Sequence, residues 1–177
     1  MTRHLLITAI AFFWLLSGCA LIHRQKAYTI KLKKDKLEQL AGQLTNASPS
    51  YFNHSYTTVV LVDSRACGMG IAETKWWSKW QQHMDDNGIG FVLVTSPTDS
   101  MDLVVVAELD SVSAPVLVLP SYEHDLEGMG YPRNGVPLHI LIDSNAAVLG
   151  YWAPQYEFIG PNKFVFAIDS LVNSSSR

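Results

Sequence analysis

The chain has 177 residues, of which 13 are Lys or Arg and 16 are Asp or Glu. This slight acidic excess argues against a nucleic-acid-binding protein, since such proteins are usually basic. The length that remains after an N-terminal leader is typical of one domain with a hydrophobic core, so we expect a single folded unit.

Residues 1–18 have the pattern of an export signal. Arg3 and His4 precede the uncharged run Leu5–Leu16, which is too short to cross a bilayer as a helix, because that takes about 20 residues. The run ends in Leu16-Ser17-Gly18-Cys19, which resembles the lipobox of bacterial lipoproteins. The resemblance implies a lipoprotein signal peptide over residues 1–18 and lipid on Cys19 that holds the mature chain on a membrane. The alternative is an ordinary secretory signal with an incidental cysteine.

Ala20 follows the lipobox cysteine, where an aspartate would resemble the signal that retains lipoproteins in the inner membrane. We therefore expect the protein in the cell envelope, on the outer membrane and facing the periplasm if the host has two membranes. With Cys19 consumed by lipid, Cys67 is the one remaining thiol in the sequence. The folded part therefore cannot form an internal disulfide.

The first mature segment, residues 19–56, is predicted to hold a short strand and a helix. Tyr28, Ile30 and Leu32 alternate with polar residues, whereas the apolar residues between Leu37 and Leu44 recur at helical spacing. Residues 45–55 are rich in Asn and Ser and predict a loop. The single domain itself is predicted over residues 57–173.

The domain opens with Val59–Val62, a continuous apolar run that is typical of a strand covered on both faces. A turn follows, and then a helix with one apolar stripe and an opposite polar face. Aromatic residues at helical spacing usually lie in the core, and this is the interpretation we favour over a ligand surface. The stripe consists of Ala72, Trp76, Trp77, Trp80 and Met84.

The remaining pattern predicts strands and helices that alternate up to a final strand pair. In chain order we expect a strand at Ile89–Thr95, a helix within Pro97–Ser111, a strand at Val116–Leu119, a polar loop over Tyr122–Asn134, two strands at Leu138–Ile142 and Ala147–Trp152, and a helix ending near Val172. This order predicts an α/β fold, a three-layer α/β/α sandwich with a central mixed sheet.

Two segments resemble the thioredoxin-like fold of the redoxin type, a group that includes membrane-anchored thiol oxidoreductases and peroxiredoxins. The first is Val59–Gly70, with Cys67 between a buried strand and a helix. The second runs from Gly135 to Asp143 and is similar to the Gly-Val-Pro segment that carries the cis proline of this family. The resemblance implies a thioredoxin-like domain.

The resemblance also implies a site around Cys67. A thiol at a helix N-terminus lies beside unpaired N–H groups and the positive end of the helix dipole, which favour the thiolate. Arg65 adds positive charge, and Ser64 stands three residues before the cysteine, where peroxiredoxins have Thr or Ser. We therefore expect Cys67, Arg65 and Ser64 to be the catalytic residues.

By the same resemblance, the binding surface comprises residues on both sides of the site. The cis proline of the family presents the backbone of the preceding residue to an incoming disulfide or peptide. The binding residues expected here are Val136, Pro137, Gly68 and Met69.

The sequence departs from the family in two places. Gly70 occupies the position of the second cysteine in the Cys-x-x-Cys motif, and Val60 stands where a peroxiredoxin has proline. A reacted Cys67 must then be resolved by another molecule. The expected partners are a protein disulfide or a peroxide, together with an external thiol reductant. Arg133 is a weaker candidate for the distant arginine of a peroxidase site.

Two alternatives remain open at this stage. The chain could keep the fold without the chemistry and serve as a binding or scaffolding protein. A Cu(I) site would need Cys67, Met69 and a histidine such as His124 or His139. His139 alternates with apolar residues and is more typical of a sheet residue in the core, so no metal and no cofactor are predicted.

Overall fold

The computed structural model describes residues 31–62, 69–131, 137–152 and 161–175, and within residues 69–73 and 161–163 it describes the backbone alone. These ranges form helices and strands that largely alternate. In chain order they are α2 (Lys34–Ala47), the 3-10 helix η1 (Pro49–Tyr51), β1 (Tyr56–Val62), α3 (Met69–Asp86), β2 (Gly90–Thr95), α4 (Ser100–Leu109), β3 (Val116–Val118), α5 (Tyr122–Met129), β4 (Leu138–Asp143), β5 (Val148–Trp152) and α6 (Pro161–Ser175).

The strands form one mixed sheet in the order β3-β2-β1-β4-β5. β1, β2 and β3 are parallel, whereas β4 is antiparallel to β1 and β5 is antiparallel to β4. The central position of β1 explains its composition, because a strand with neighbours on both sides and helices on both faces has no solvent-facing positions. Val59, Val60, Leu61 and Val62 are all buried, which confirms the prediction made from this run.

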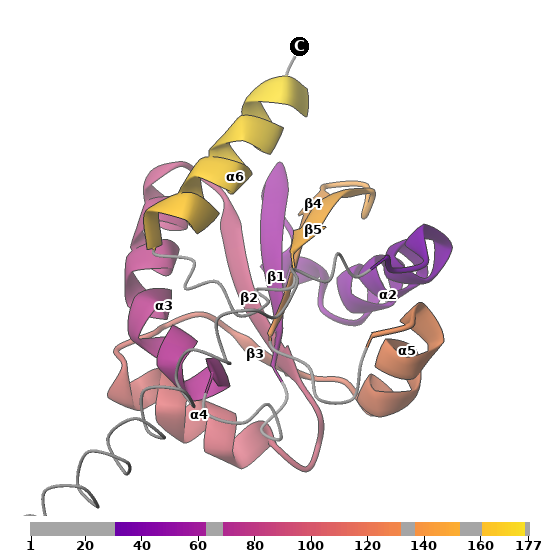
Figure 1. The fold of residues 1–177 in the computed structure, drawn as a ribbon, viewed down its shortest axis with the longest axis horizontal. Coiled ribbons are helices and arrows are strands. Elements are labelled where there is room, and N and C mark those ends of the chain that lie inside the picture. Colours follow the sequence, from indigo (N-terminus) through magenta and orange to yellow (C-terminus); the bar gives the residue numbers. More distant parts are fainter. Residues whose placement is uncertain (1–30, 63–68, 132–136, 153–160, 176–177) are drawn as a thin grey trace, which may run out of the picture.

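Helices cover both faces of the sheet (Figure 1). α2 and α5 pack on the face to which Val59 and Leu61 point. α3, α4 and α6 pack on the opposite face, to which Val60 and Val62 point. Successive side chains of a strand point to opposite faces, so β1 contributes to both hydrophobic clusters. The predicted three-layer α/β/α sandwich with a central mixed sheet is confirmed.

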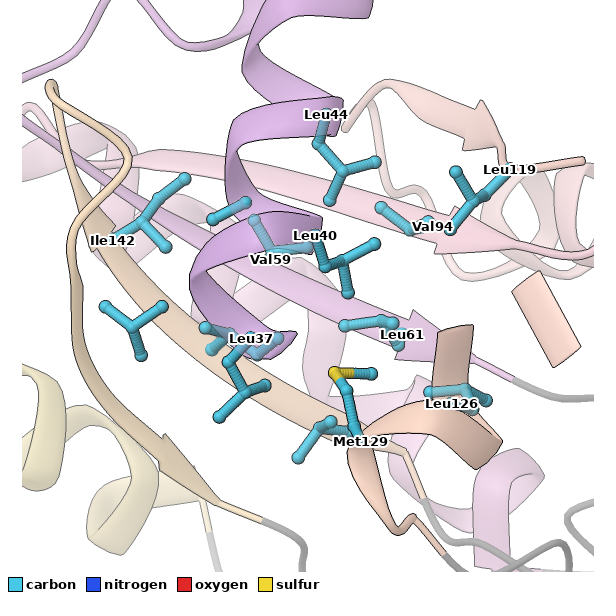
Figure 2. Packing of buried hydrophobic residues seen from close by; sticks show 14 of the residues in the cluster. Leu37, Leu40, Leu44, Val59, Leu61, Val94, Leu119, Leu126, Met129 and Ile142 are labelled. Atoms are coloured by element: carbon cyan, nitrogen blue, oxygen red, sulfur yellow. The ribbon is translucent and has the colours of Figure 1, made fainter. Parts of the chain in front are cut away.

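The first face is closed by a leucine row from α2. Leu37, Leu40 and Leu44 lie against the sheet, and Leu126 and Met129 of α5 pack beside them (Figure 2). The predicted helix in this segment is therefore confirmed, and its apolar positions belong to the same core as the strands. The division of the chain between residues 56 and 57 stays a prediction.

Hydrogen bonds from two backbone N–H groups hold the segment that precedes α2. The Lys33 N–H donates to the Met129 carbonyl at 3.1 Å, and the Leu32 N–H donates to the Tyr151 hydroxyl at 3.2 Å. Leu32 does not belong to a strand, and Tyr28 and Ile30 of the predicted strand lie outside the described residues. The start of the described chain is thus held against α5 and β5.

The opposite face is built around the tryptophans of α3. Trp77, Trp80 and Met84 are buried in one cluster with residues of α4 and α6, which confirms that this stripe belongs to the core. Trp76 is half-buried. The ammonium groups of Lys75 and Lys79 lie over its ring, 5.2 and 5.4 Å from the ring centroid. The side chain of Ala72 lies outside the described residues.

The prediction of a polar loop over Tyr122–Asn134 is wrong, because its first part is the helix α5. Tyr122, Leu126 and Met129 are buried at a spacing of four and three residues, so the apolar stripe of a helix is present. Gly130 ends the helix in the left-handed conformation, with φ 81°. A helix this short is stabilised mainly by packing against the core rather than by its own propensity.

Candidate functional site

The two segments with family resemblance approach one edge of the sheet. β1 ends at Val62, and α3 begins at Met69. Leu138, the first residue of β4, pairs with Leu61, so the buried residue Pro137 precedes this pair at the end of β1. The chain therefore leaves β1 and enters β4 at the same edge, which we call the β1 edge.

Most of the predicted site residues lie outside the described residues. This holds for Ser64, Arg65, Cys67 and Gly68, for Val136 and for Arg133. Met69 is described as the first residue of α3, without its side chain. The cis geometry expected at Pro137 concerns the bond to Val136 and stays a prediction, as do the catalytic and binding roles.

Buried polar residues at the β1 edge, which the sequence analysis did not predict, follow β2. The Thr95 hydroxyl donates to the Val62 carbonyl at 3.0 Å and so joins the ends of β2 and β1. The next residue, Ser96, donates its hydroxyl to the Asp99 carboxylate at 2.9 Å and accepts the Asp99 N–H at 3.2 Å. Ser96 and Asp99 are 3% and 6% exposed.

This Ser96–Asp99 pair satisfies polar groups that burial would otherwise penalise. It lies in the turn that connects β2 to α4, and Asp99 is the N-cap residue of α4. The signal in the sequence was the spacing Ser-x-x-Asp directly before an apolar helical run, a pattern related to helix capping. The pair places a carboxylate near the β1 edge and at the start of α4.

The two histidines considered for a metal site lie on opposite sides of the sheet. His139 is 1% exposed, with its ring centroid 4.6 Å from that of Phe164 and 5.5 Å from that of Trp80. The expectation of a core histidine is confirmed. His124 lies on α5, with a side chain that is 90% exposed. In the described part of the chain, no three residues of the types His, Cys, Asp and Glu are grouped as metal ligands.

The proposed anchor lies outside the described residues as well, since these begin at Lys31. Among the helices that the structure describes, none has both the length and the apolar character needed to cross a membrane. The leader over residues 1–18 and the lipid on Cys19 therefore stay predictions from the sequence.

No protein-family model matches the chain, and no curated protein matches it. Solved structures do match. A thiol:disulfide interchange protein from Bacteroides sp. is 20% identical with a TM-score of 0.52, over 69% of this chain and 76% of that one. The thioredoxin domain of a thiol-disulfide oxidoreductase from Bacteroides vulgatus is 19% identical with a TM-score of 0.52, over 69% and 83%.

A third match is the thiol:disulfide interchange protein of the thioredoxin family from Chlorobium tepidum TLS. It is 17% identical with a TM-score of 0.55, and the match covers 71% of this chain and 84% of that one. At such identities the likeness concerns the fold rather than the activity. The helix and strand order, the mixed sheet and these neighbours agree, and the chain therefore has a thioredoxin-like fold.

Proposed function

We propose that the protein is a lipid-anchored, thioredoxin-fold protein of the bacterial cell envelope whose Cys67 thiolate attacks a disulfide or a peroxide. The observation that carries the proposal is the convergence at the β1 edge. Cys67 stands two residues before Met69, the first residue of α3, and Pro137 precedes the strand that pairs with β1. These are the two elements that the family resemblance requires to be neighbours.

The start of α3 favours a thiolate on electrostatic grounds. α3 has 18 residues, so its N-terminus carries a full helix dipole and N–H groups without intrahelical partners. Both favour negative charge close to the first turn and lower the pKa of a thiol placed there. The names of the solved neighbours, which are thiol:disulfide interchange proteins and an oxidoreductase domain, support the same chemistry.

The reaction has to be completed by a second molecule. In attack on a disulfide, the Cys67 sulfur bonds to one substrate sulfur and the other leaves as a thiolate, which gives a mixed disulfide. In attack on hydrogen peroxide, the O–O bond breaks, Cys67 becomes a sulfenic acid and hydroxide leaves. Because Gly70 replaces the second cysteine, an external thiol must then reduce Cys67 in both cases.

The anchor sets the compartment of this chemistry. Lipid on Cys19 would hold residues 19–177 at the outer membrane, facing the periplasm, with residues 57–173 as the thioredoxin-like domain. Two or more acyl chains are needed for stable anchoring, since a single chain binds reversibly. Replacing Cys19 with serine should move the protein from the membrane fraction to the soluble fraction, and the lipid itself is identified by mass spectrometry of the N-terminal peptide.

A non-catalytic envelope protein is the second candidate. The observation in its favour is the incomplete motif, because Gly70 removes the second cysteine and Val60 removes the proline of the peroxidase pattern. In that case the fold serves as a binding surface, and Cys67 is a small apolar residue in the core.

Alkylation of Cys67 separates the two candidates. The rate constant for reaction of the full chain with iodoacetamide is measured against pH, with Cys67→Ser as the control for other sites. We expect an apparent pKa clearly below about 8.5, the value of a free cysteine. Alkylation that requires prior unfolding of the domain would contradict the catalytic proposal. Formation of a mixed disulfide with oxidised glutathione, or of a sulfenic acid that dimedone traps, then identifies the class of substrate.

A further inference from the structure

Helix α4 exposes apolar side chains where a helix on the surface of a sheet normally carries polar ones. Leu103 and Ala107 are buried against the sheet, as expected. On the outer side, however, Met101 is 73% and Leu109 is 79% exposed. Of the seven large apolar side chains that are exposed in the described part of the chain, four lie on α4.

Three of these side chains form a row along α4, and a further exposed apolar residue lies on β3, the strand that α4 contacts. Met101, Val105 and Leu109 are four residues apart and therefore follow one line along the helix. Val116 of β3 packs on the same side of the sheet as α4, so Val118, two residues later and 47% exposed, points to that side too. We call Met101, Val104, Val105, Leu109 and Val118 the α4 surface. It lies at one margin of the molecule (Figure 1), where α4 contacts β3, the edge strand of the described sheet.

The charged residues on α4 and directly after it are all acidic. Asp102 and Glu108 are exposed on α4 itself, and Asp110 follows directly. From residue 80 to residue 132 the sequence contains no Lys or Arg, and Lys79, the last basic residue before that stretch, is held over the ring of Trp76 on α3. An apolar surface with a carboxylate rim attracts a ligand that is apolar and positively charged.

We propose that the α4 surface is a docking site for a partner polypeptide that presents apolar side chains flanked by Lys or Arg. A second copy of this chain fits less well, since a two-fold contact would bring the Asp102 and Glu108 carboxylates of both copies together. An anionic bilayer is disfavoured for the same reason. The inference goes beyond the proposed thiol chemistry and does not depend on whether Cys67 reacts.

A designed peptide of defined sequence tests this proposal. A fluorescein-labelled peptide of Leu and Lys at helical spacing is titrated with the full chain in nanodiscs of zwitterionic lipid, and binding is followed by fluorescence anisotropy. Empty nanodiscs correct for binding to lipid. We expect saturable binding that weakens as salt is raised, because the carboxylate rim contributes. A peptide with Glu in place of Lys should bind at least tenfold more weakly.

Substitutions then locate the site. The double substitution Met101→Lys and Leu109→Lys, and separately the single substitution Val105→Lys, should each raise the Kd about tenfold or more. Phe166→Lys is the matched control, because Phe166 is also 73% exposed but lies on α6, and its Kd should equal that of the unmodified chain. Circular dichroism checks that every variant stays folded.

Three results would overturn the proposal. They are the absence of binding to the Leu/Lys peptide, equal binding of the Leu/Lys and Leu/Glu peptides, and equal Kd values for the unmodified chain and both α4 variants. Analytical ultracentrifugation supplies a further outcome. If the unmodified chain is a dimer and the double variant is a monomer, the surface is a contact between copies instead, and the partner proposal is wrong.

Discussion

Two glycines at the end of α5 respond in opposite directions to the same substitution if this segment is a helix. Gly128 lies inside α5, and Gly130 follows its end with φ 81°. An added Cβ meets no atom within 4 Å at either position. Steric contact is thereby removed as a variable, and the backbone conformation alone decides the effect.

The magnitudes follow from that conformation. Gly128→Ala should stabilise the fold by about 0.5–1 kcal/mol, since alanine is the better helix former by that amount. Gly130→Ala should destabilise it by about 1–2 kcal/mol, because an L-residue is strained in the left-handed region. Gly130→Asn should fall between Gly130 and Gly130→Ala, as asparagine tolerates this conformation better. The expected separation of the two alanine variants is therefore roughly 1.5–3 kcal/mol.

Equilibrium unfolding in urea, followed by tryptophan fluorescence, measures these differences. The comparison is internal, because both variants add one methyl group to the same short segment. Changes of the same sign, or a separation below about 0.5 kcal/mol, which is the usual range of neutral surface substitutions, would refute the helix and its left-handed end.

Two further predictions concern contacts of the β1 edge and of α6. Asp99→Ala removes the buried partner of Ser96 and should lower the free energy of unfolding by about 1–3 kcal/mol, whereas the exposed control Glu108→Ala should change it by less than about 0.5 kcal/mol. Both are read from urea unfolding, and equal effects would contradict the burial of Asp99. At Gly150, an added Cβ would lie 2.5 Å from Leu171 Cδ1 of α6. Because this atom is the end of a flexible, half-buried side chain that can move aside, Gly150→Ala should cost about 1 kcal/mol, the low end of the range for overpacking. In a Leu171→Ala background the cost of Gly150→Ala should vanish. Additive effects within about 0.5 kcal/mol in the double-mutant cycle would contradict the predicted clash.

The strands could be predicted from the sequence because their signal is strong and local. The run Val59–Val62 has no polar position, and this is compatible only with a strand buried on both faces or a buried helix segment. The turn at Asp143 could also be predicted from its residue types. In the structure, the Asp143 carboxylate accepts the Asn145 and Ala147 N–H groups, each at 2.8 Å. Asp and Asn favour such turns through these side-chain bonds.

Helix α5 was not predicted, because its stability depends on contacts with the rest of the molecule rather than on its own residues. Glycine and acidic residues outnumber its three core positions, and eight residues are too few for a helix that is stable on its own propensity. Its stability comes from Tyr122, Leu126 and Met129, which pack against α2 and the sheet. The Ser96–Asp99 pair was missed for a related reason, because both residues are polar and their burial follows from the way β2 and α4 meet.

The topology connects the two proposals. β2 is parallel to β1 and Thr95 pairs with Val62, so α4, which begins five residues after Thr95 at Ser100, starts near the β1 edge. A partner held on the α4 surface therefore binds close to the edge at which the Cys67 segment begins. This arrangement suits a single-cysteine mechanism, since a mixed disulfide without an internal resolving thiol lasts until another molecule arrives. If both proposals hold, α4 would supply affinity for the partner and Cys67 would supply the reactive thiol, so substitutions on the α4 surface are expected to weaken binding without changing the alkylation rate of Cys67.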